Sequence, residues 1–167
     1  DRFSRGGLTM ANHWSNGWIE LLSGVAQAGV GKSEEALGAL SRAVLLDGQF
    51  DHELTGFAFL VQGEIALEAG NLQAAANLFA EAGYAAYAYR DFYVLDEALR
   101  QGFTTHISQG AEGVYPPLPV VATWSQRDNL AHLAVAAQLG VADSLAASRQ
   151  TGGASAALTA VSSRSRD

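Results

Sequence analysis

The chain has 167 residues, of which 49% are hydrophobic and 16% are charged, and it contains no cysteine. This length suits one domain with a sizeable core, and the high apolar content argues against a mainly disordered chain. Ten basic residues against 17 acidic residues give a net charge of −7, which argues against a general nucleic-acid or acidic-membrane binder.

Helical spacing of apolar residues begins near the start of the chain. Large apolar residues between Leu8 and Val25 step by three or four positions, which predicts a helix that ends at Gly29. Ser33 suits the N-cap of a second helix, which carries two glutamates in its first turn and closes near residue 47. The chain therefore opens with a predicted helical hairpin.

The same plan continues to the end of the chain. Further helices are predicted over 54–69, 72–89, 92–108, 119–126 and 129–150, and a last weak helix is predicted beyond Gly152. Pro119 suits the first turn of its helix, and Asn129 is expected to cap the one that follows. No useful stretch alternates apolar and polar residues, so the predicted class is all-α with seven or eight helices.

Two segments of the chain match each other in residue type and spacing. Gly24, Gly31, Ala36, Leu40 and Ala43 align with Gly63, Gly70, Ala75, Phe79 and Ala82 at a constant offset of 39 residues. Small residues let two helices approach closely, and a large side chain beside them fills the remaining space. Ala36 and Ala75 are therefore expected to be buried where helices cross.

This pattern resembles the tetratricopeptide repeat (TPR), which has a small residue in its first helix, Gly at the turn, and Ala, an aromatic residue and Ala in its second helix. The resemblance covers residues 20–85, and it departs from the family in its 39-residue offset, because the standard repeat has about 34 residues. It implies stacked antiparallel helical hairpins, a TPR-like superhelix, over residues 1–150. A weakly helical or frayed tail is expected over 151–167.

The resemblance also implies where a partner would bind. In this family the first helices of the hairpins line the concave side, which here would present Trp18, Leu21, Phe57, Leu60, Glu64 and Glu68. Apolar anchors beside two carboxylates suit a protein or peptide that carries basic and aromatic residues. We therefore expect a non-catalytic protein-interaction or scaffold module that is part of a larger chain, an oligomer or another assembly.

Aromatic residues cluster between positions 84 and 93, and they support an alternative function. Core packing is their first explanation, since alanine-rich helices need large neighbours to fill space. The alternative is a ligand pocket made of Tyr84, Tyr87, Phe92 and Tyr93. The chain would then be a helical small-molecule-binding domain with an aromatic pocket around residues 84–103.

Catalytic, cofactor and metal sites are not predicted. Gly31-Lys32-Ser33 fits a permissive phosphate-loop pattern, but it follows a predicted helix and not a strand. The four histidines are scattered, and the sequence contains no recognisable nucleophile–base pair or metal triad. No apolar run approaches the ~20 residues that span a membrane. The compartment stays open, with a soluble cytoplasmic protein slightly favoured.

Overall fold

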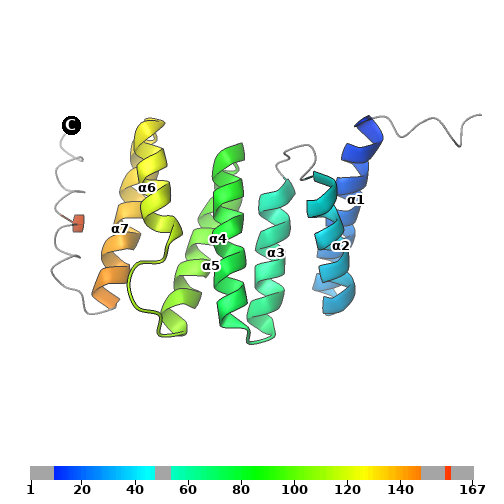
Figure 1. Ribbon diagram of the computed structural model, residues 1–167, viewed down its shortest axis with the longest axis horizontal. Coiled ribbons are helices and arrows are strands. Elements are labelled where there is room, and N and C mark those ends of the chain that lie inside the picture. Colours follow the sequence, from blue (N-terminus) through cyan, green and yellow to red (C-terminus); the bar gives the residue numbers. More distant parts are fainter. Residues whose placement is uncertain (1–9, 48–53, 148–156, 159–167) are drawn as a thin grey trace, which may run out of the picture.

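The computed structural model of the chain describes residues 10–47, 54–147 and 157–158. Its helices are α1 (Met10–Gly29), α2 (Ser33–Asp47), α3 (Leu54–Glu68), α4 (Leu72–Tyr89), α5 (Phe92–Ser108), α6 (Pro117–Arg127) and α7 (Ala131–Ala147). No strand occurs in the described ranges, so the predicted all-α class is confirmed. The helices stand side by side in an elongated stack, with α1 and α2 at one end and α6 and α7 at the other (Figure 1).

Two of the predicted helix caps are wrong by one residue. The first backbone bond of α2 runs from the Ala36 N–H to the Lys32 carbonyl, so Lys32 holds the cap position and Ser33 is the first helical residue. Asn129 has a φ of 58° and lies in the turn before α7, where the Leu130 carbonyl accepts the first helical bond. The predicted end of this helix at residue 150, and the predicted tail except residues 157–158, lie outside the described residues.

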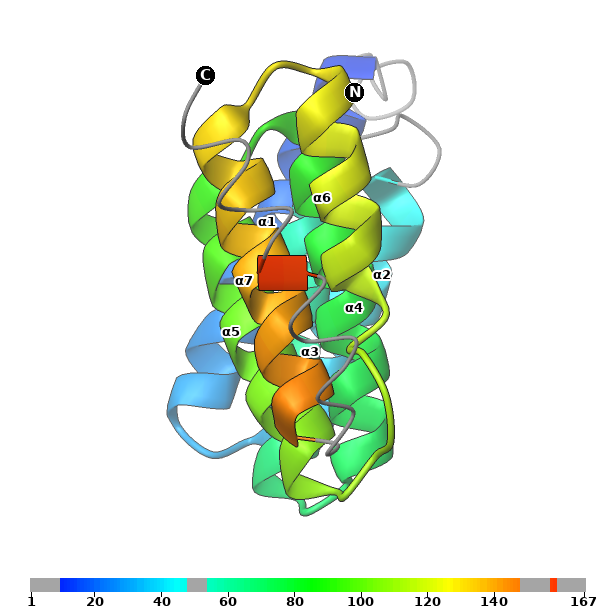
Figure 2. The same ribbon diagram turned by 90° about the vertical axis from the view of Figure 1, so that its left-hand side faces the viewer.

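Neighbouring helices pack as antiparallel hairpins over most of the stack. The closest pairs are α1 with α2, α3 with α4, α4 with α5, and α6 with α7. Along the stack, α2, α4 and α6 lie on one side while α5 and α7 lie on the other (Figure 2). By contrast, α5 and α6 make little backbone contact although they follow one another in the chain. The consecutive helices α5 and α6 therefore do not form a hairpin with each other.

The two segments that align in the sequence make equivalent contacts, one between α1 and α2 and the other between α3 and α4. Ala36 and Ala75 are fully buried, as expected for small residues where helices cross. A Cβ added at Gly24 would lie 2.7 Å from the Leu40 side chain, and one added at Gly63 would lie 2.6 Å from the Phe79 ring. In both hairpins a glycine on the first helix thus receives the large side chain of the second helix.

Tyr115 lies in the connection between α5 and α6, and its side chain is fully buried. Its hydroxyl donates a hydrogen bond of 3.3 Å to the Ala76 carbonyl of α4, and its backbone N–H donates to Ser144 Oγ of α7 at 3.4 Å. Its ring lies beside His106, and a Cβ added at Gly102 would collide with its hydroxyl. One buried tyrosine therefore connects three helices.

Candidate functional site

A hollow with a volume of about 600 Å³ lies between α5 and α7. Its walls are mainly aliphatic and aromatic: Phe92, Leu95, Leu99 and Phe103 come from α5, and Leu133, Ala136, Ala137, Leu139 and Gly140 come from α7, with Leu118 of α6 beside them. On α5 these positions recur every three or four residues, so that helix presents one continuous apolar face to the hollow, while α7 contributes a broader apolar surface. We call this site the α5–α7 groove.

Charged and titratable side chains stand at the edges of the groove. Asp96 and Arg100 line it from α5, and His132 and Asp143 line it from α7. The Arg100 guanidinium is already engaged, because it donates to both oxygens of Glu97. Asp96 and Asp143 are exposed and make no hydrogen bond with the other described residues. The groove therefore offers the exposed carboxylates of Asp96 and Asp143 to a cation, and Asp96 also interacts electrostatically with Arg100.

A hydrogen-bonded network on α5 holds the arginine at this edge. The pKa of the Glu97 carboxyl is lowered by its hydrogen bonds from Arg100 and, to a smaller extent, from Gln101. Gln101 Nε2 also donates to Glu64 Oε1 on α3 at 2.9 Å. Arg100 is thus directed toward its own helix, and the carboxylates dominate the charge that the groove presents.

The peptide-binding face predicted from the repeat is only partly at the surface. Leu21 and Leu60 are 1% and 3% exposed and belong to the core, so neither can serve as a surface anchor. Trp18 and Phe57 are half-buried and pack against the N-terminal core cluster. Of the two predicted carboxylates, Glu64 accepts the bond from Gln101 and Glu68 is exposed.

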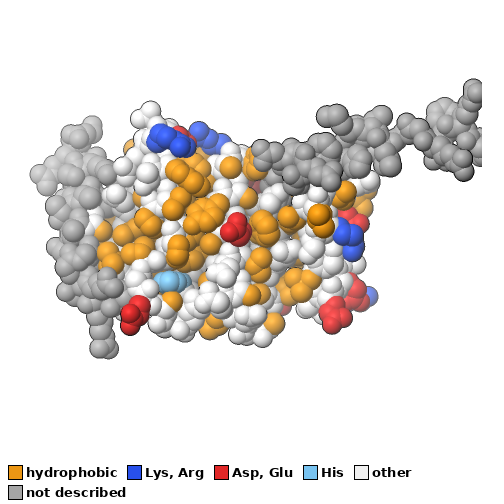
Figure 3. All heavy atoms as spheres, viewed as in Figure 1, with side chains coloured by type: hydrophobic (Ala, Val, Ile, Leu, Met, Phe, Trp, Pro, Cys, Tyr) orange, Lys and Arg blue, Asp and Glu red, His pale blue; other side chains and the backbone are white. Residues whose placement is uncertain are grey.

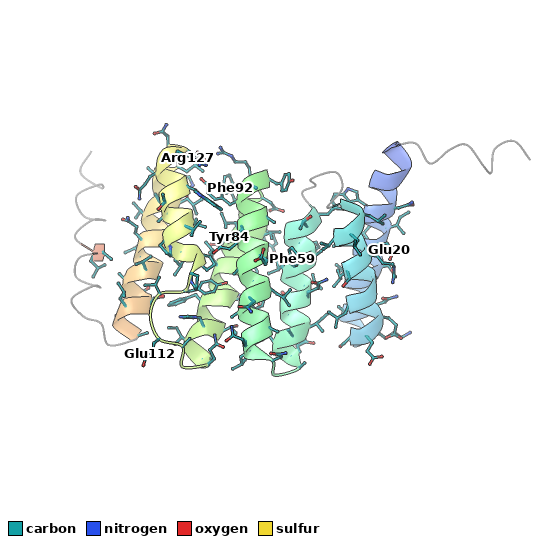
Figure 4. All side chains as sticks on the ribbon, viewed as in Figure 1. Glu20, Phe59, Tyr84, Phe92, Glu112 and Arg127 are labelled. Atoms are coloured by element: carbon teal, nitrogen blue, oxygen red, sulfur yellow. The ribbon has the colours of Figure 1, made fainter. Side chains whose placement is uncertain are left out.

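The aromatic residues predicted as an alternative pocket fall into three different environments. Tyr84 lies in the space between α4 and α6 (Figure 4), and both Tyr84 and Tyr87 pack against Trp124 with ring centroids 5.9 and 5.1 Å apart. Phe92 lines the α5–α7 groove, whereas Tyr93 is 78% exposed and points to solvent. The structure therefore does not gather these four residues into one pocket.

None of the α7 residues that line the groove was predicted as a site residue from the sequence. The sequence of α7 nevertheless indicates a surface of this kind, because the helix carries large aliphatic residues on more than one face. Leu133 and Leu139 lie toward the groove side, while Val135 and Val141 lie elsewhere around the helix. A helix that is apolar on several faces needs neighbours on several sides.

Other kinds of site find no support in the described part of the chain. Within the described ranges, no group of three or more His, Cys, Asp or Glu residues could hold a metal ion. The helices described here are each too short or too polar to cross a membrane. Lys32 is exposed in the turn after α1, where Gly31 has a φ of 76°.

Comparisons with known proteins return no relatives. No protein-family model, no curated protein and no solved structure matches the chain. The fold and the site together define its class, which is an all-helical stack of antiparallel hairpins with an apolar surface groove between α5 and α7.

Proposed function

We propose that the chain is a non-catalytic, TPR-like protein-interaction module that binds an apolar, basic segment of a partner protein in the α5–α7 groove. The observation that supports this function best is the groove itself, with its apolar walls and the carboxylates of Asp96 and Asp143 at its edges. The resemblance of residues 20–85 to the TPR supports the same class. Since fold alone does not determine function, the groove carries the proposal.

The chemistry of the groove favours an amphipathic helical segment as the ligand. Two parallel helical walls lined by leucines and phenylalanines accept apolar side chains that recur at positions i, i+3 or i+4, and i+7 of a partner helix. Burial of such anchors supplies affinity, and Lys or Arg residues on the flanks of the segment would meet Asp96 and Asp143. An acidic segment would be repelled, because the whole chain carries a charge of −7.

A direct test uses designed helical peptides that carry leucines at these spacings with either lysine or glutamate on the flanks. We expect the lysine peptide to bind and to shift the amide resonances of α5 and α7 in NMR spectra. Leu139→Glu should weaken binding at least tenfold, whereas Leu45→Glu, an exposed leucine on α2 outside the groove, should not. Binding that is unchanged in Leu139→Glu would show that the groove is not the site.

Charge reversal tests the selectivity of the same site. Replacement of Asp96 and Asp143 by lysine should reverse the preference, so that the glutamate peptide binds more tightly than the lysine peptide. The helical circular dichroism should not change, because both side chains are exposed. An unaltered preference would remove these carboxylates from the proposal.

A second candidate function is the binding of an apolar small molecule. The volume of about 600 Å³ falls within the range of about 300–1,000 Å³ that small-molecule sites occupy, and two phenylalanines, Phe92 and Phe103, line the hollow. A thermal-shift screen of small apolar amines distinguishes the two functions. A compound that stabilises the unmodified chain but not Leu139→Glu, in the absence of peptide binding, would favour this candidate.

A further inference from the structure

A second hollow, with a volume of about 320 Å³, lies where the end of α3 and the start of α4 meet the C-terminal half of α5. Leu67 and Leu72 form its aliphatic wall, and α5 supplies a polar wall with Arg100, Gln101, Thr104 and Ser108. We call this site the α3–α5 hollow. Its size is at the lower end of the range of about 300–1,000 Å³ that small-molecule sites occupy. It can therefore receive a small ligand, or one side chain, with an aliphatic body and a polar end.

The polar side chains of this wall have already used the hydrogens that they can donate. Thr104 Oγ1 donates to the Arg100 carbonyl at 2.9 Å, and Ser108 Oγ donates to the Thr104 carbonyl at 2.8 Å. Gln101 Nε2 donates to two carboxylates, at 2.9 and 2.7 Å. A hydroxyl has one hydrogen and a carboxamide nitrogen has two, so these three side chains present only acceptors to a ligand.

The acceptor oxygens of the same side chains are open. Gln101 Oε1, Thr104 Oγ1 and Ser108 Oγ accept no hydrogen bond from the other described residues. Gln101 is half-buried, and Thr104 and Ser108 are exposed. Steps of three and four residues place the three side chains on one face of α5. A ligand that complements this face has to bring hydrogen-bond donors.

The charge around the hollow selects a cationic donor. Arg100 is the one basic residue among those that line it, and its guanidinium donates to both oxygens of Glu97, so this pair is neutral. Glu64 accepts its bond from the neutral Gln101 amide and forms no ion pair with the other described residues. Glu68 is exposed one helical turn further along α3. The carboxylates therefore outnumber the basic groups beside the hollow, which favours a cation over an anion.

We infer that the α3–α5 hollow binds a primary alkylammonium group, which a lysine side chain or a free aliphatic amine would supply. An ammonium has three N–H donors and no acceptor, so it brings one donor for each of the open oxygens of Gln101, Thr104 and Ser108. Its alkyl chain lies along Leu67 and Leu72. An alcohol has one donor and no charge, and a carboxylate brings acceptors to a wall of acceptors.

This site goes beyond the protein-interaction function proposed above. The α3–α5 hollow and the α5–α7 groove lie on different sides of α5 and share only Arg100. Leu139→Glu, which should weaken peptide binding in the groove, should leave the affinity of the hollow for an amine unchanged. Failure of one site therefore leaves the other unaffected.

NMR titrations of the full chain with n-butylammonium chloride, butan-1-ol and sodium butyrate test the inference. We expect the ammonium to bind most tightly, with saturable shifts of the amide resonances over 101–108. Thr104→Val/Ser108→Ala removes two acceptors at exposed positions and should weaken its binding about fivefold or more. Thr123→Val is the matched control, since Thr123 is exposed and donates to the Pro119 carbonyl in the same way on α6. Tighter or equal binding of butanol or butyrate, or unchanged ammonium binding in the double variant, would overturn the inference.

Glu64→Gln tests the role of charge without removing the contact to α5. The new amide oxygen can still accept from Gln101, but the negative charge is lost, so the ammonium should bind more weakly while butanol binding stays the same. Equal ammonium affinity in this variant and in the unmodified chain would overturn the choice of a cation.

A titration with N-acetyl-lysine methylamide distinguishes the two sources of the ammonium group. Binding as tight as that of n-butylammonium would assign the hollow to a lysine side chain of a protein partner. Binding of n-butylammonium alone would assign it to a free aliphatic amine. Absence of binding by both compounds would overturn the inference.

Discussion

The hydroxyl of Tyr87 donates a hydrogen bond of 2.9 Å to the Asp128 carboxylate, and this bond joins α4 to the turn that follows α6. Arg127 Nε donates to the other carboxylate oxygen at 3.0 Å, and an Arg90 nitrogen lies 3.6 Å from the first. Basic groups accordingly gather around an acidic group at this end of α6 (Figure 3). A single carboxylate thereby connects the α4–α5 turn to the α6–α7 turn.

The first prediction concerns the stability of this connection in acid. Hydrogen bonds from Arg127 and Tyr87 lower the pKa of the Asp128 carboxyl. Such a group stabilises the fold above its unfolded pKa of about 3.9, and this contribution is lost as the pH falls through the lower folded value. The free energy of unfolding should therefore fall below about pH 4, and it should fall less steeply in Asp128→Asn. Urea denaturation at a series of pH values measures this difference.

Asp143→Asn is the control for that experiment. Its carboxylate makes no hydrogen bond with the described residues, so the variant should keep the acid dependence of the unmodified chain. If Asp128→Asn and Asp143→Asn gave the same pH profile, the connection through Asp128 would contribute nothing measurable to stability.

The second prediction concerns Tyr115 and alkaline pH. Burial raises the pKa of its phenol. A phenol of this kind stabilises the fold below its unfolded pKa of about 10, and the contribution is lost as the pH rises toward the folded value. Tyr115→Phe removes the hydrogen bond to Ala76 and should cost about 1 kcal/mol at neutral pH. The decline above about pH 10 should become shallower in this variant, as chemical denaturation in alkaline buffers would show.

The third prediction tests the small residues of the repeat. Ala75 is fully buried where α3 and α4 cross, so Ala75→Leu should overpack the contact and lower the free energy of unfolding by about 1–3 kcal/mol. Ala88→Leu places the same side chain at an exposed position of the same helix and should change stability little. Thermal melts of the two variants should differ clearly, and coinciding melts would argue against close packing at Ala75.

The fourth prediction compares equivalent helix starts in the two aligned segments. Asn71 caps α4, where its side chain accepts a bond of 3.2 Å from the Ala74 N–H, and Lys32 holds the matching position before α2. Asn71→Ala should cost about 1 kcal/mol. Lys32→Asn should stabilise the chain by a comparable amount, because lysine has no acceptor with which to cap the helix. Lys32→Ala serves as the neutral reference in denaturant titrations, and a loss of stability in Lys32→Asn would contradict this account of the α2 start.

Local signals allowed most of the helices to be predicted. The bounds of α4 and α5 agree with the expected ranges 72–89 and 92–108, because apolar period, turn glycines and capping side chains act within a few residues. The N-cap of α2 was predicted at Ser33, but the helix begins one residue earlier, with Lys32 at the cap position. A side chain that suits the cap does not by itself decide at which residue a helix begins.

The internal repeat carried information about tertiary contacts as well. The aligned pairs Gly24–Leu40 and Gly63–Phe79 proved to be equivalent contacts between neighbouring helices. Such contacts follow from sequence when a small and a large residue recur at constant spacing in one hairpin. Gly102 lies a further 39 residues along the chain, yet its large neighbour is Tyr115, from a connection and not from a helix.

The sequence alone thus determined the helical class, most helix bounds and the burial of Ala36 and Ala75 in the first two hairpins. Only the tertiary structure decided that α5 packs with α4 and not with α6, that Leu21 and Leu60 are core residues, and that α5 and α7 form a groove. The reason is physical: helical periodicity defines which residues share a face, whereas the burial of that face depends on where later helices pack. In this chain several helices are apolar on more than one face, so the packing of the helices decided which of these faces became buried.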